Sequence, residues 1–497
     1  MIKMSVTPGD PYTGLDRFGR LADQRWLKTS DGTHRERVQY GFDRASNRVW
    51  RDNLVGTSNQ DEYYTYDGLY QLKTLKRGNL NAGKTDIGGT PVWQEDWNYD
   101  PTGNWRGVAS AYVTRVNGST TLDQNRSHDP ANEILTLTGT PDWPDPTHDA
   151  AGNLTQVPQP ATPTSSYDCK FDAWDRLVEV KVTGGAVVST LRYDGLKRRV
   201  TKVAGGNTRH YYYSHRWQVL EERLNALTTA DRQFVWGLRH VDDLIERDRG
   251  SERFYVLHDH LSVTAILNTA AVVQERYGYD GFGPQRVLDA SFGARAATLY
   301  DWETGFGAYR LDTESALYQV RHRYLHTKLG RWISRDPLRD AVAPSYYAYV
   351  RNAPVTALDR SGLFLTGCRR DPCSDPCGDA KKSGQVPSGQ IGGVVCCGGK
   401  KYSCSWYSNT NKEIEGLIKT CILKHEDDHH DDVDCPPTGG PIQPLPRDPT
   451  SQKAEEKKAW EITRKCLIDA YCKCKTQACR DELLEWLKAI NKGQKRM

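Results

Sequence analysis

Residues 170–200, KFDAWDRLVEVKVTGGAVVSTLRYDGLKRRV, contain the pattern that decides the fold. Twice in this stretch an aromatic residue is followed by aspartate, at Asp172 and at Asp194, and a similar run of residues follows each aspartate. An aspartate that opens a turn can accept hydrogen bonds from the backbone two residues ahead, and glycine or asparagine three positions on tolerates positive φ. The aromatic residue ends one strand and the apolar residue after the turn begins the next. Each copy of the pattern therefore predicts a β-hairpin.

The same pattern recurs along the first two thirds of the chain. Aspartates preceded by an aromatic residue or histidine stand at Asp43, Asp67, Asp100, Asp129, Asp149, Asp172, Asp194 and Asp280. A lone hairpin cannot bury its own apolar face, so successive hairpins must pair side by side into one long twisted sheet. Unrelated turns are the alternative, and the agreement of spacing and internal order disfavours it.

These repeats resemble those of the YD-repeat, or RHS, family of surface and toxin-delivery proteins. HDHLSVTAILNTAAVVQERYGYDGFG, at 258–283, is similar to a family hairpin, and residues 318–363 are similar to the RHS repeat-associated core module. The resemblance covers residues 12–363. It implies that β-hairpin repeats at 1–257 wind into a mainly β shell and that a core domain at 258–363 closes one end.

In some members of the family the core module cuts the chain just after its Gly-Leu and releases a variable C-terminal cargo. By this resemblance the bond that is cut here joins Leu363 to Phe364. Arg335 and Asp336 match the start of the self-cleaving stretch. The resemblance therefore implies self-cleavage after residue 363.

Two aspartyl carboxylates that share a proton could supply both the acid and the base for peptide hydrolysis. Asp336 would be one of them, and Asp340 and Asp359 are both candidates for the second. The chain ends its core module with DRSGL at 359–363, where the family's usual ending, DPxGL, has proline in the second position. The sequence leaves the choice of the second aspartate open.

Cysteine use changes abruptly after residue 363. Only Cys169 comes earlier, and twelve cysteines follow, at Cys368, Cys373, Cys377, Cys396, Cys397, Cys404, Cys421, Cys435, Cys466, Cys472, Cys474 and Cys479. Such density predicts a disulfide scaffold made for an oxidising compartment. Zinc held by cysteines is the competing interpretation, but Cys-Lys-Cys at 472–474 and Cys-Cys at 396–397 lack the usual C-x-x-C spacing. We expect a Cys-, Gly- and Pro-rich linker at 364–410.

A predicted helix at 411–433 covers all but the last two residues of ILKHEDDHHDDVDC, residues 422–435. Its apolar stripe continues into His425 and His429, which stand one turn apart on the same face. This spacing lets two imidazoles bind one Zn²⁺, and Glu426 between them can take a proton from metal-bound water. A solvated acidic helix end is the alternative, because aspartates surround the motif.

The next predicted helix, at 452–471, contains the candidates for a third zinc ligand. Glu456 lies at one end of its apolar stripe, where an unpaired carboxylate would be costly and a metal would remove the cost. Glu455 is adjacent and could exchange roles with it. Cargo domains of the RHS family are similar in layout, and this resemblance implies that Glu456 is the third ligand. We expect a small, Cys-rich, mainly α domain at 411–497.

Composition and charge limit the classes of partner and the cellular location that we expect. The net charge of +4 gives no broad basic face, so nucleic acid is not an expected partner. No apolar run is long enough to span a membrane, and the N-terminus lacks a signal-peptide core. We expect a secreted or cell-surface protein that is exported by another route or has lost an upstream segment.

Two functions remain open. The first is an RHS-type carrier that presents a toxin-like, zinc-dependent peptidase-like cargo, with a target-cell protein as substrate and an immunity protein as a further partner. The second is a non-enzymatic surface protein whose aromatic-rich sheet binds glycans or partner cells, with a disulfide-stapled tail.

Overall fold

The computed structural model describes residues 14–56, 59–238, 240–259, 262–337 and 345–363 with their side chains. Only the backbone is described for short strands at 2–4, 392–397, 400–405, 433–434 and 443–444. The chain divides into two compact units, 1–339 with 343–365 and 340–342 with 366–497, and each is described by itself. The predicted helix at 452–471 lies outside the described residues, and so does the one at 411–433 except for Val433, whose backbone forms a short strand with Asp434.

The first unit begins with a ten-stranded sheet in which every strand pairs with its neighbour in sequence. Its strands are β1 (Ile2–Met4), β2 (Asp23–Lys28), β3 (His34–Phe42), β4 (Arg48–Asn53), β5 (Asp61–Tyr66), β6 (Leu72–Gly78), β7 (Trp93–Trp97), β8 (Tyr112–Val116), β9 (Ser119–His128) and β10 (Ile134–Thr140). All pairings are antiparallel, as consecutive hairpins require.

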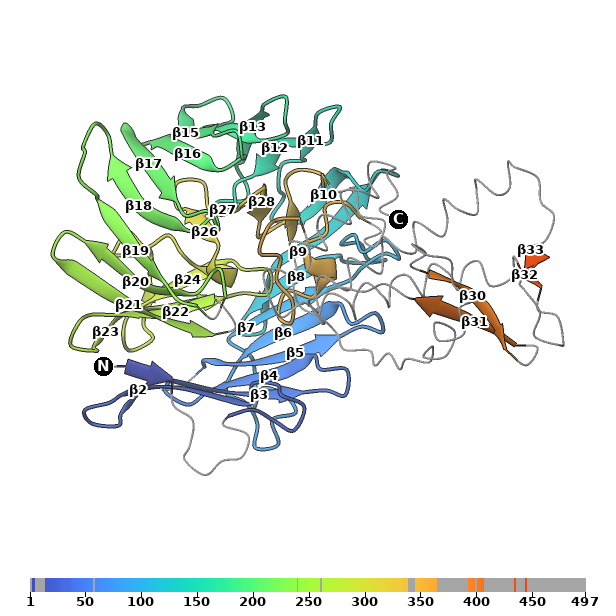
Figure 1. Ribbon diagram of the computed structural model, residues 1–497, viewed down its shortest axis with the longest axis horizontal. Helices are drawn as coiled ribbons and strands as arrows, with labels where there is room; N and C mark the ends of the chain where they lie inside the picture. Colours follow the sequence, from blue (N-terminus) through green and yellow to red (C-terminus); the bar gives the residue numbers. More distant parts are fainter. Residues whose placement is uncertain are drawn as a thin grey trace. The chain divides into compact units, whose positions relative to one another are not determined.

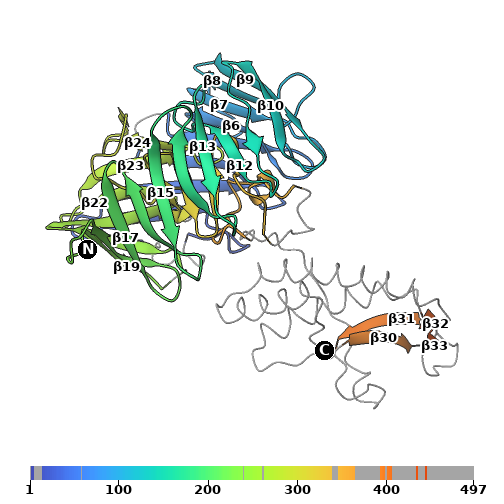
Figure 2. The same cartoon turned by 90° about the horizontal axis from the view of Figure 1, so that it is seen from above.

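A fifteen-stranded antiparallel sheet follows, again in sequence order. Its strands are β11 (Thr147–His148), β12 (Leu154–Pro158), β13 (Ser166–Phe171), β14 (Leu177–Val182), β15 (Val187–Tyr193), β16 (Arg199–Ala204), β17 (Asn207–Tyr213), β18 (Val219–Leu224), β19 (Arg232–Trp236), β20 (Leu244–Arg249), β21 (Glu252–Asp259), β22 (Ser262–Leu267), β23 (Val273–Tyr279), β24 (Gln285–Leu288) and β25 (Ala294–Arg295). Figure 2 shows strands of this sheet in one curved row. The sheet runs past residue 258 without a break.

The expected single sheet is thus divided in two, between β10 and β11. The connecting sequence PDWPDP, residues 141–146, holds three prolines, which have no N–H to donate to a strand ladder. Trp143 in its middle is buried in the core. Proline content therefore explains where the backbone ladder stops.

Residues 302–337 and 345–363 form a segment that we call the plug. It holds a four-stranded sheet, β26 (Arg310–Asp312), β27 (Leu317–Val320), β28 (Arg323–His326) and β29 (Arg331–Trp332), and two 3-10 turns, η1 (Phe306–Ala308) and η2 (Val350–Asn352). In Figure 1 the plug strands (gold) lie between the two large sheets. Arg126 Nη1 donates to Leu329 O at 2.8 Å and Leu154 N to Ile333 O at 2.8 Å, so both sheets hold the plug.

The second unit contributes two described strand pairs, β30 (Gly392–Cys397) with β31 (Lys400–Ser405), and β32 (Val433–Asp434) with β33 (Gln443–Pro444). Cys396 and Cys397 lie on β30 and Cys404 lies on β31. The disulfide prediction concerns side chains outside the described part of the chain, so it stays a prediction.

Most repeat turns are held by their aspartate, as the sequence predicts; Asp280 differs, because its carboxylate contacts Arg77 and Arg286. Asp172 Oδ1 accepts hydrogen bonds from the backbone N–H groups of Trp174 at 2.9 Å and Arg176 at 3.1 Å, and its Oδ2 accepts one from Arg176 Nε at 2.7 Å. The residue three positions on, Asp175, has φ +58°. The same three contacts recur in the turns that begin at Asp16, Asp67, Asp100, Asp149 and Asp194.

The aromatic residue before the aspartate links one repeat to the previous one. Tyr99 Oη donates to Leu72 O at 2.6 Å, and Tyr193 Oη donates to Leu177 O at 2.6 Å. In both cases the accepting carbonyl lies five residues after the preceding turn aspartate. Tyrosine in this place is therefore a staple between consecutive hairpins as well as a packing residue.

Replacing Tyr99 by phenylalanine is expected to lower the free energy of unfolding by about 1 kcal/mol, because the ring stays and the hydrogen bond is lost. Urea denaturation of the full chain measures the change. Tyr212→Phe is the matched control, since Tyr212 is 45% exposed. Equal losses in the two variants would show that the staple contributes nothing.

The first strands meet the last ones through side chains, at a contact that we call the seam. Trp26 of β2 packs with buried apolar residues of β21 to β23, and Arg276 Nη2 donates to Arg35 O at 3.0 Å. Figure 1 shows β2 and β3 (blue) beside β21 and β23 (yellow-green). The two sheets therefore wrap around the plug and close on themselves at the seam.

Candidate functional site

The end of the plug brings two aspartates to one arginine. Arg323 opens β28, Asp336 follows β29, and Asp359 lies in the turn after η2. The distance from Arg323 Nη2 is 2.9 Å to Asp336 Oδ2 and 3.4 Å to Asp359 Oδ2. All three side chains are buried or nearly so. The fixed positive charge of the guanidinium offsets the repulsion between the two carboxylates.

The carboxylate of Asp359 also holds the last described residues. Its Oδ1 accepts hydrogen bonds from the backbone N–H groups of Ser361 at 3.1 Å, Gly362 at 2.8 Å and Leu363 at 3.1 Å. Arg323 Nε donates to the carbonyl of Gly362. Gly362 has φ +73°, and a Cβ there would come within 2.5 Å of a backbone oxygen, so only glycine fits. The peptide that precedes the predicted cut is thus tied to the same arginine and aspartate.

Two tyrosines fix the backbone of Asp359. Tyr309 Oη donates to Asp359 O at 2.8 Å and accepts from Asp359 N at 2.9 Å, and it lies 2.9 Å from Tyr349 Oη. Burial raises the pKa of Tyr309 far above its usual value, so its hydroxyl keeps its proton. Asp359 is therefore held at its main chain and at both carboxylate oxygens.

Arg335 faces the wall of the shell. Its Nη2 contacts Glu133 Oε1 at 2.5 Å, and its Nε donates to Tyr347 Oη at 3.1 Å. Tyr347 Oη in turn donates to Gly152 O at 2.6 Å. Arg335 therefore attaches its own segment, which also contains Asp336, to the ten- and fifteen-stranded sheets. None of its described contacts is with Asp336 or Asp359.

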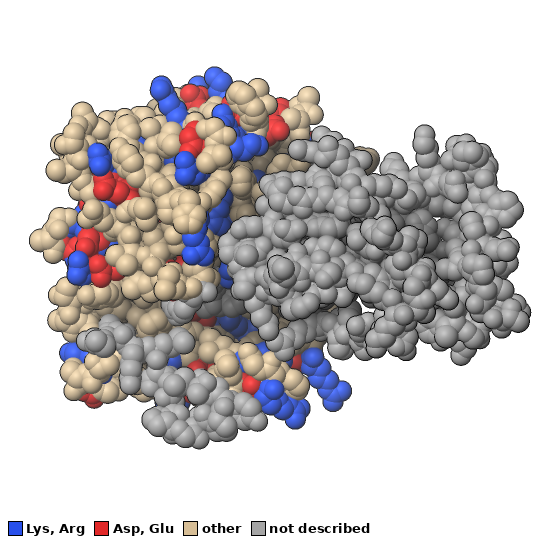
Figure 3. Space-filling model, in the orientation of Figure 1, with Lys and Arg blue, Asp and Glu red and all other residues tan. Residues whose placement is uncertain are grey.

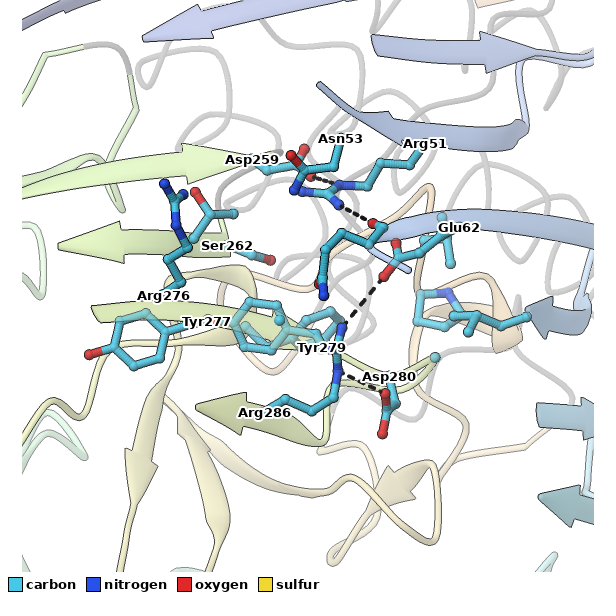
Figure 4. Close-up of a pocket in the computed structure, with 18 of the residues that line it drawn as sticks. Arg51, Asn53, Glu62, Asp259, Ser262, Arg276, Tyr277, Tyr279, Asp280 and Arg286 are labelled. Carbon is cyan, nitrogen blue, oxygen red and sulfur yellow. Dashed lines mark hydrogen bonds and ion pairs between the residues drawn. The ribbon is translucent and has the colours of Figure 1, made fainter. Parts of the chain in front are cut away.

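A second cluster of charges surrounds a cavity at the seam (Figure 4). Arg51 Nε contacts Asp259 Oδ2 at 2.7 Å, and Arg286 Nε contacts Asp280 Oδ1 at 3.3 Å. Arg286 also lies 3.9 Å from Glu62. The cavity measures about 90 Å³, which is room for a few water molecules.

Burial and charge act against each other at Asp259. Burial by itself would raise the pKa of Asp259, but the charges of Arg51 and Arg48 and the hydrogen bond from Tyr40 outweigh it and lower that pKa to about 2. The cavity lining carries equal numbers of arginines and acids, Arg48, Arg51, Arg276 and Arg286 with Glu36, Glu62, Asp259 and Asp280. This balance gives no net charge to attract a charged ligand. We assign the cluster to closing the seam.

The surface shows the same balance. On the face drawn in Figure 3, basic and acidic side chains of the described residues are interspersed. Within the described ranges no helix has the length and apolar character needed to cross a membrane.

Comparison with known proteins shows which proteins the chain is similar to. No family model matches the chain. The tRNA3(Ser)-specific nuclease WapA of Bacillus spizizenii is 26% identical over 300 residues, which are 58% of this chain and 12% of that protein. The chain is homologous to the RHS-repeat toxin WapA. The match covers a small part of WapA's length.

Two further comparisons bear on the RHS assignment. The toxin protein Tse5 of Pseudomonas aeruginosa is 46% identical over 54 residues, 11% of this chain and 4% of that protein. The crystal structure of TcdB2-TccC3-TEV superposes with a TM-score of 0.54 at 19% identity, covering 73% of this chain and 18% of that one. This likeness shows the fold, and it confirms the predicted mainly β, antiparallel RHS shell.

The RHS shell places some of the predicted site residues and not others. It brings Asp336 and Asp359 to one guanidinium, with Leu363 N–H hydrogen-bonded to Asp359, and it directs Arg335 elsewhere. Asp340 and Phe364 lie outside the described residues, as do the predicted catalytic Glu426 and the predicted zinc ligands His425, His429 and Glu456. Where the structure is described, no group of three or more His, Cys, Asp or Glu side chains could hold a metal. Zinc binding therefore stays a prediction.

Sequence reasoning did not find Arg323. The sequence did contain a sign that this arginine is buried. Arg323 starts the sequence RYLH, in which an aromatic and an apolar residue follow the arginine. All four residues of this strand are buried. A buried arginine needs acidic partners, and this requirement points to aspartates nearby in the fold.

Proposed function

We propose that the chain is an RHS-type toxin carrier that presents a C-terminal effector and frees it by cutting its own backbone between Leu363 and Phe364. The observation that supports this function best is the meeting of Asp336 and Asp359 at Arg323, directly beside Leu363. Homology to WapA supports the carrier role. A secreted or cell-surface location and an immunity protein as partner go with this proposal.

The two aspartates can divide the chemistry of hydrolysis. One carboxylate takes a proton from a water molecule, which attacks the carbonyl carbon of Leu363, and the other, protonated, gives its proton to the leaving nitrogen of Phe364. The C–N bond breaks, one water is consumed, and a carboxylate and an amine are formed. We assign the role of second aspartate to Asp359, whose Oδ1 accepts a hydrogen bond from Leu363 N.

Self-cleavage predicts two fragments in place of the full-length chain of 56.2 kDa. Mass spectrometry is expected to find Phe364 at the new N-terminus. The variant Asp336→Asn should stay intact, and Asp248→Asn, which alters an exposed ion pair, should cut as the wild type does. A wild-type protein that shows only the full-length band would contradict the proposal.

We propose further that the effector is a zinc-dependent, peptidase-like hydrolase that acts on a target-cell protein. His425, His429 and Glu456 would hold Zn²⁺, which polarises water and the substrate carbonyl. Glu426 would take the proton from that water and pass it to the leaving amine. The support is the His-Glu-x-x-His spacing on a predicted apolar helix face, followed by a carboxylate on the next predicted helix.

Metal analysis of the full chain after dialysis is expected to find about one zinc per chain. His425→Ala should lose it. His430→Ala is the matched control, because His430 is predicted to lie off the face shared by His425 and His429, and it should keep the metal. No zinc in the dialysed wild-type protein would contradict the peptidase proposal and leave the carrier proposal standing.

One observation favours the alternative, a non-enzymatic surface protein. Large apolar residues stand at the same position of several repeat turns, two after the aspartate, and they are exposed: Phe18 by 55%, Leu69 by 69%, Trp174 by 64% and Leu196 by 63%. Such a row could bind glycans or partner cells. Under this alternative Trp174→Ala weakens binding to target cells, and Glu426→Gln changes nothing.

A further inference from the structure

We propose that Arg323 is the positioning residue of the self-cleavage site, holding both aspartates and the peptide before the cut with one guanidinium. This inference rests on the proposed self-cleavage. It assigns a role to a residue of β28 that the motif of the self-cleaving stretch does not contain.

The guanidinium of Arg323 is fully engaged. Its Nε donates to the carbonyl of Gly362, and its Nη2 contacts Asp336 at 2.9 Å and Asp359 at 3.4 Å. The guanidinium carbon stacks 4.3 Å over the ring of Trp332, and the side chain is only 4% exposed. A planar fork held on one face by an aromatic ring cannot turn without breaking several contacts.

These contacts join three segments that are separate in the chain. Asp336 follows β29, whereas Asp359 and Gly362 belong to the turn after η2. Asp359 spans the gap to the cut, since one of its oxygens contacts Arg323 and the other accepts Leu363 N–H at 3.1 Å. The carboxylates and the backbone next to the cut are therefore joined through Arg323 by ion pairs and hydrogen bonds.

Arg323 acts through position and charge. A guanidinium does not give up its proton at any ordinary pH, so it is neither the acid nor the base of the reaction. Misplacing reacting groups by about 1 Å can cost on the order of 10²-fold in rate. Lysine keeps the charge at this site but has all its donors on one nitrogen, so it cannot reproduce the separate contacts that Arg323 makes through Nε and Nη2.

The neighbouring charged groups keep their own partners. Arg321 pairs with Asp242 and with the carbonyl of Arg360. His322 is mostly buried, and burial, followed by the charges of Lys197, Arg321 and Arg323, lowers its pKa to about 4. None of these groups takes the place of Arg323 between the aspartates.

The test follows cleavage of the full chain over time after cell-free synthesis. Arg323→Ala is expected to slow it on the order of 10²-fold, and Arg323→Lys should also cut more slowly than the wild type. Millimolar methylguanidinium should restore part of the rate to Arg323→Ala, an effect that misfolding would not produce. Arg253→Ala, which removes an exposed arginine, is the matched control and should cut normally.

The outcomes separate the two proposals. If the wild type cuts and folded Arg323→Lys or Arg323→Ala cuts equally fast, the positioning role is overturned and self-cleavage stands. If the wild type does not cut, self-cleavage fails, and hydrogen exchange at the Gly362 and Leu363 amides decides about Arg323. Exchange at least about tenfold faster in Arg323→Ala supports the positioning role of Arg323, since the freed turn opens more often. Unchanged exchange overturns that role.

Discussion

Replacing Asp259 by asparagine is expected to lower the free energy of unfolding of the shell by about 3–5 kcal/mol. Asp259 ends β21, and its buried carboxylate contacts Arg51 at 2.7 Å and Arg48 at 3.8 Å, both on β4. The substitution removes the negative charge and leaves two arginines buried without it. Because the pair joins the first strands to the last, the loss falls on the closure of the whole shell.

Urea denaturation of the full chain measures this change. Asp248→Asn is the matched control, since it makes the same substitution in a pair whose Arg253 side chain is 46% exposed. The control is expected to lose less than about 1 kcal/mol. Equal losses at Asp248 and Asp259 would mean that the seam contributes no more than a surface ion pair does.

Acid is expected to weaken the shell through its buried histidines. His326 of the plug is completely buried, and its Nε2 donates to Pro158 O at 2.7 Å while its Nδ1 accepts from Leu329 N at 3.0 Å. This geometry requires the neutral ring, because a proton on Nδ1 would face the N–H of Leu329. Burial, followed by the charge of Arg126, lowers the pKa of His326 to about 4.

The direction of the effect follows from proton linkage. The unfolded chain takes up a proton at each histidine near pH 6.5, whereas folded His326 stays neutral down to about pH 4. The stability that this histidine contributes is therefore complete above pH 6.5 and is lost as the pH falls from 6.5 to about 4. For His326 alone the loss amounts to about 3 kcal/mol. His128 and His148, whose pKa values burial lowers to about 3 and about 4, act in the same direction. Glu95, whose pKa burial raises to about 7, acts in the opposite direction and offsets the contribution of about one histidine.

Urea midpoints between pH 7 and pH 4 test this prediction. The free energy of unfolding should fall steeply over that interval in the wild type. The slope of the free energy of unfolding against pH measures how many protons the chain takes up on unfolding. In His326→Gln this number should be smaller by up to one, although the variant loses some stability at pH 7. His215→Gln, at an exposed position, should leave stability at pH 7 unchanged. A wild-type stability that is flat from pH 7 to pH 4.5 would contradict the account.

The amino-acid sequence determined the repeat unit. The turn at Asp172 is complete within five residues, because the aspartate, the residue with positive φ and the donor at Arg176 are all local. Local hydrogen bonds of this kind can be predicted without knowing the rest of the fold. Predictions of antiparallel pairing in sequence order follow from the same hairpins. The His-Glu-x-x-His motif is equally plain in the sequence, and its metal stays a prediction.

Only the tertiary structure decided which distant charges meet. Asp259 and Tyr40 are separated by 219 residues and yet share a hydrogen bond, because the winding of the sheets returns the last strands to the first. Arg323 meets Asp336 and Asp359 because the plug folds its own end back onto β28. The repeat pattern of the sequence does not predict which strands meet at the seam, because that depends on the summed twist of many strands. The repeat is therefore set by short-range hydrogen bonds, and the seam and the cleavage site by how the whole chain packs.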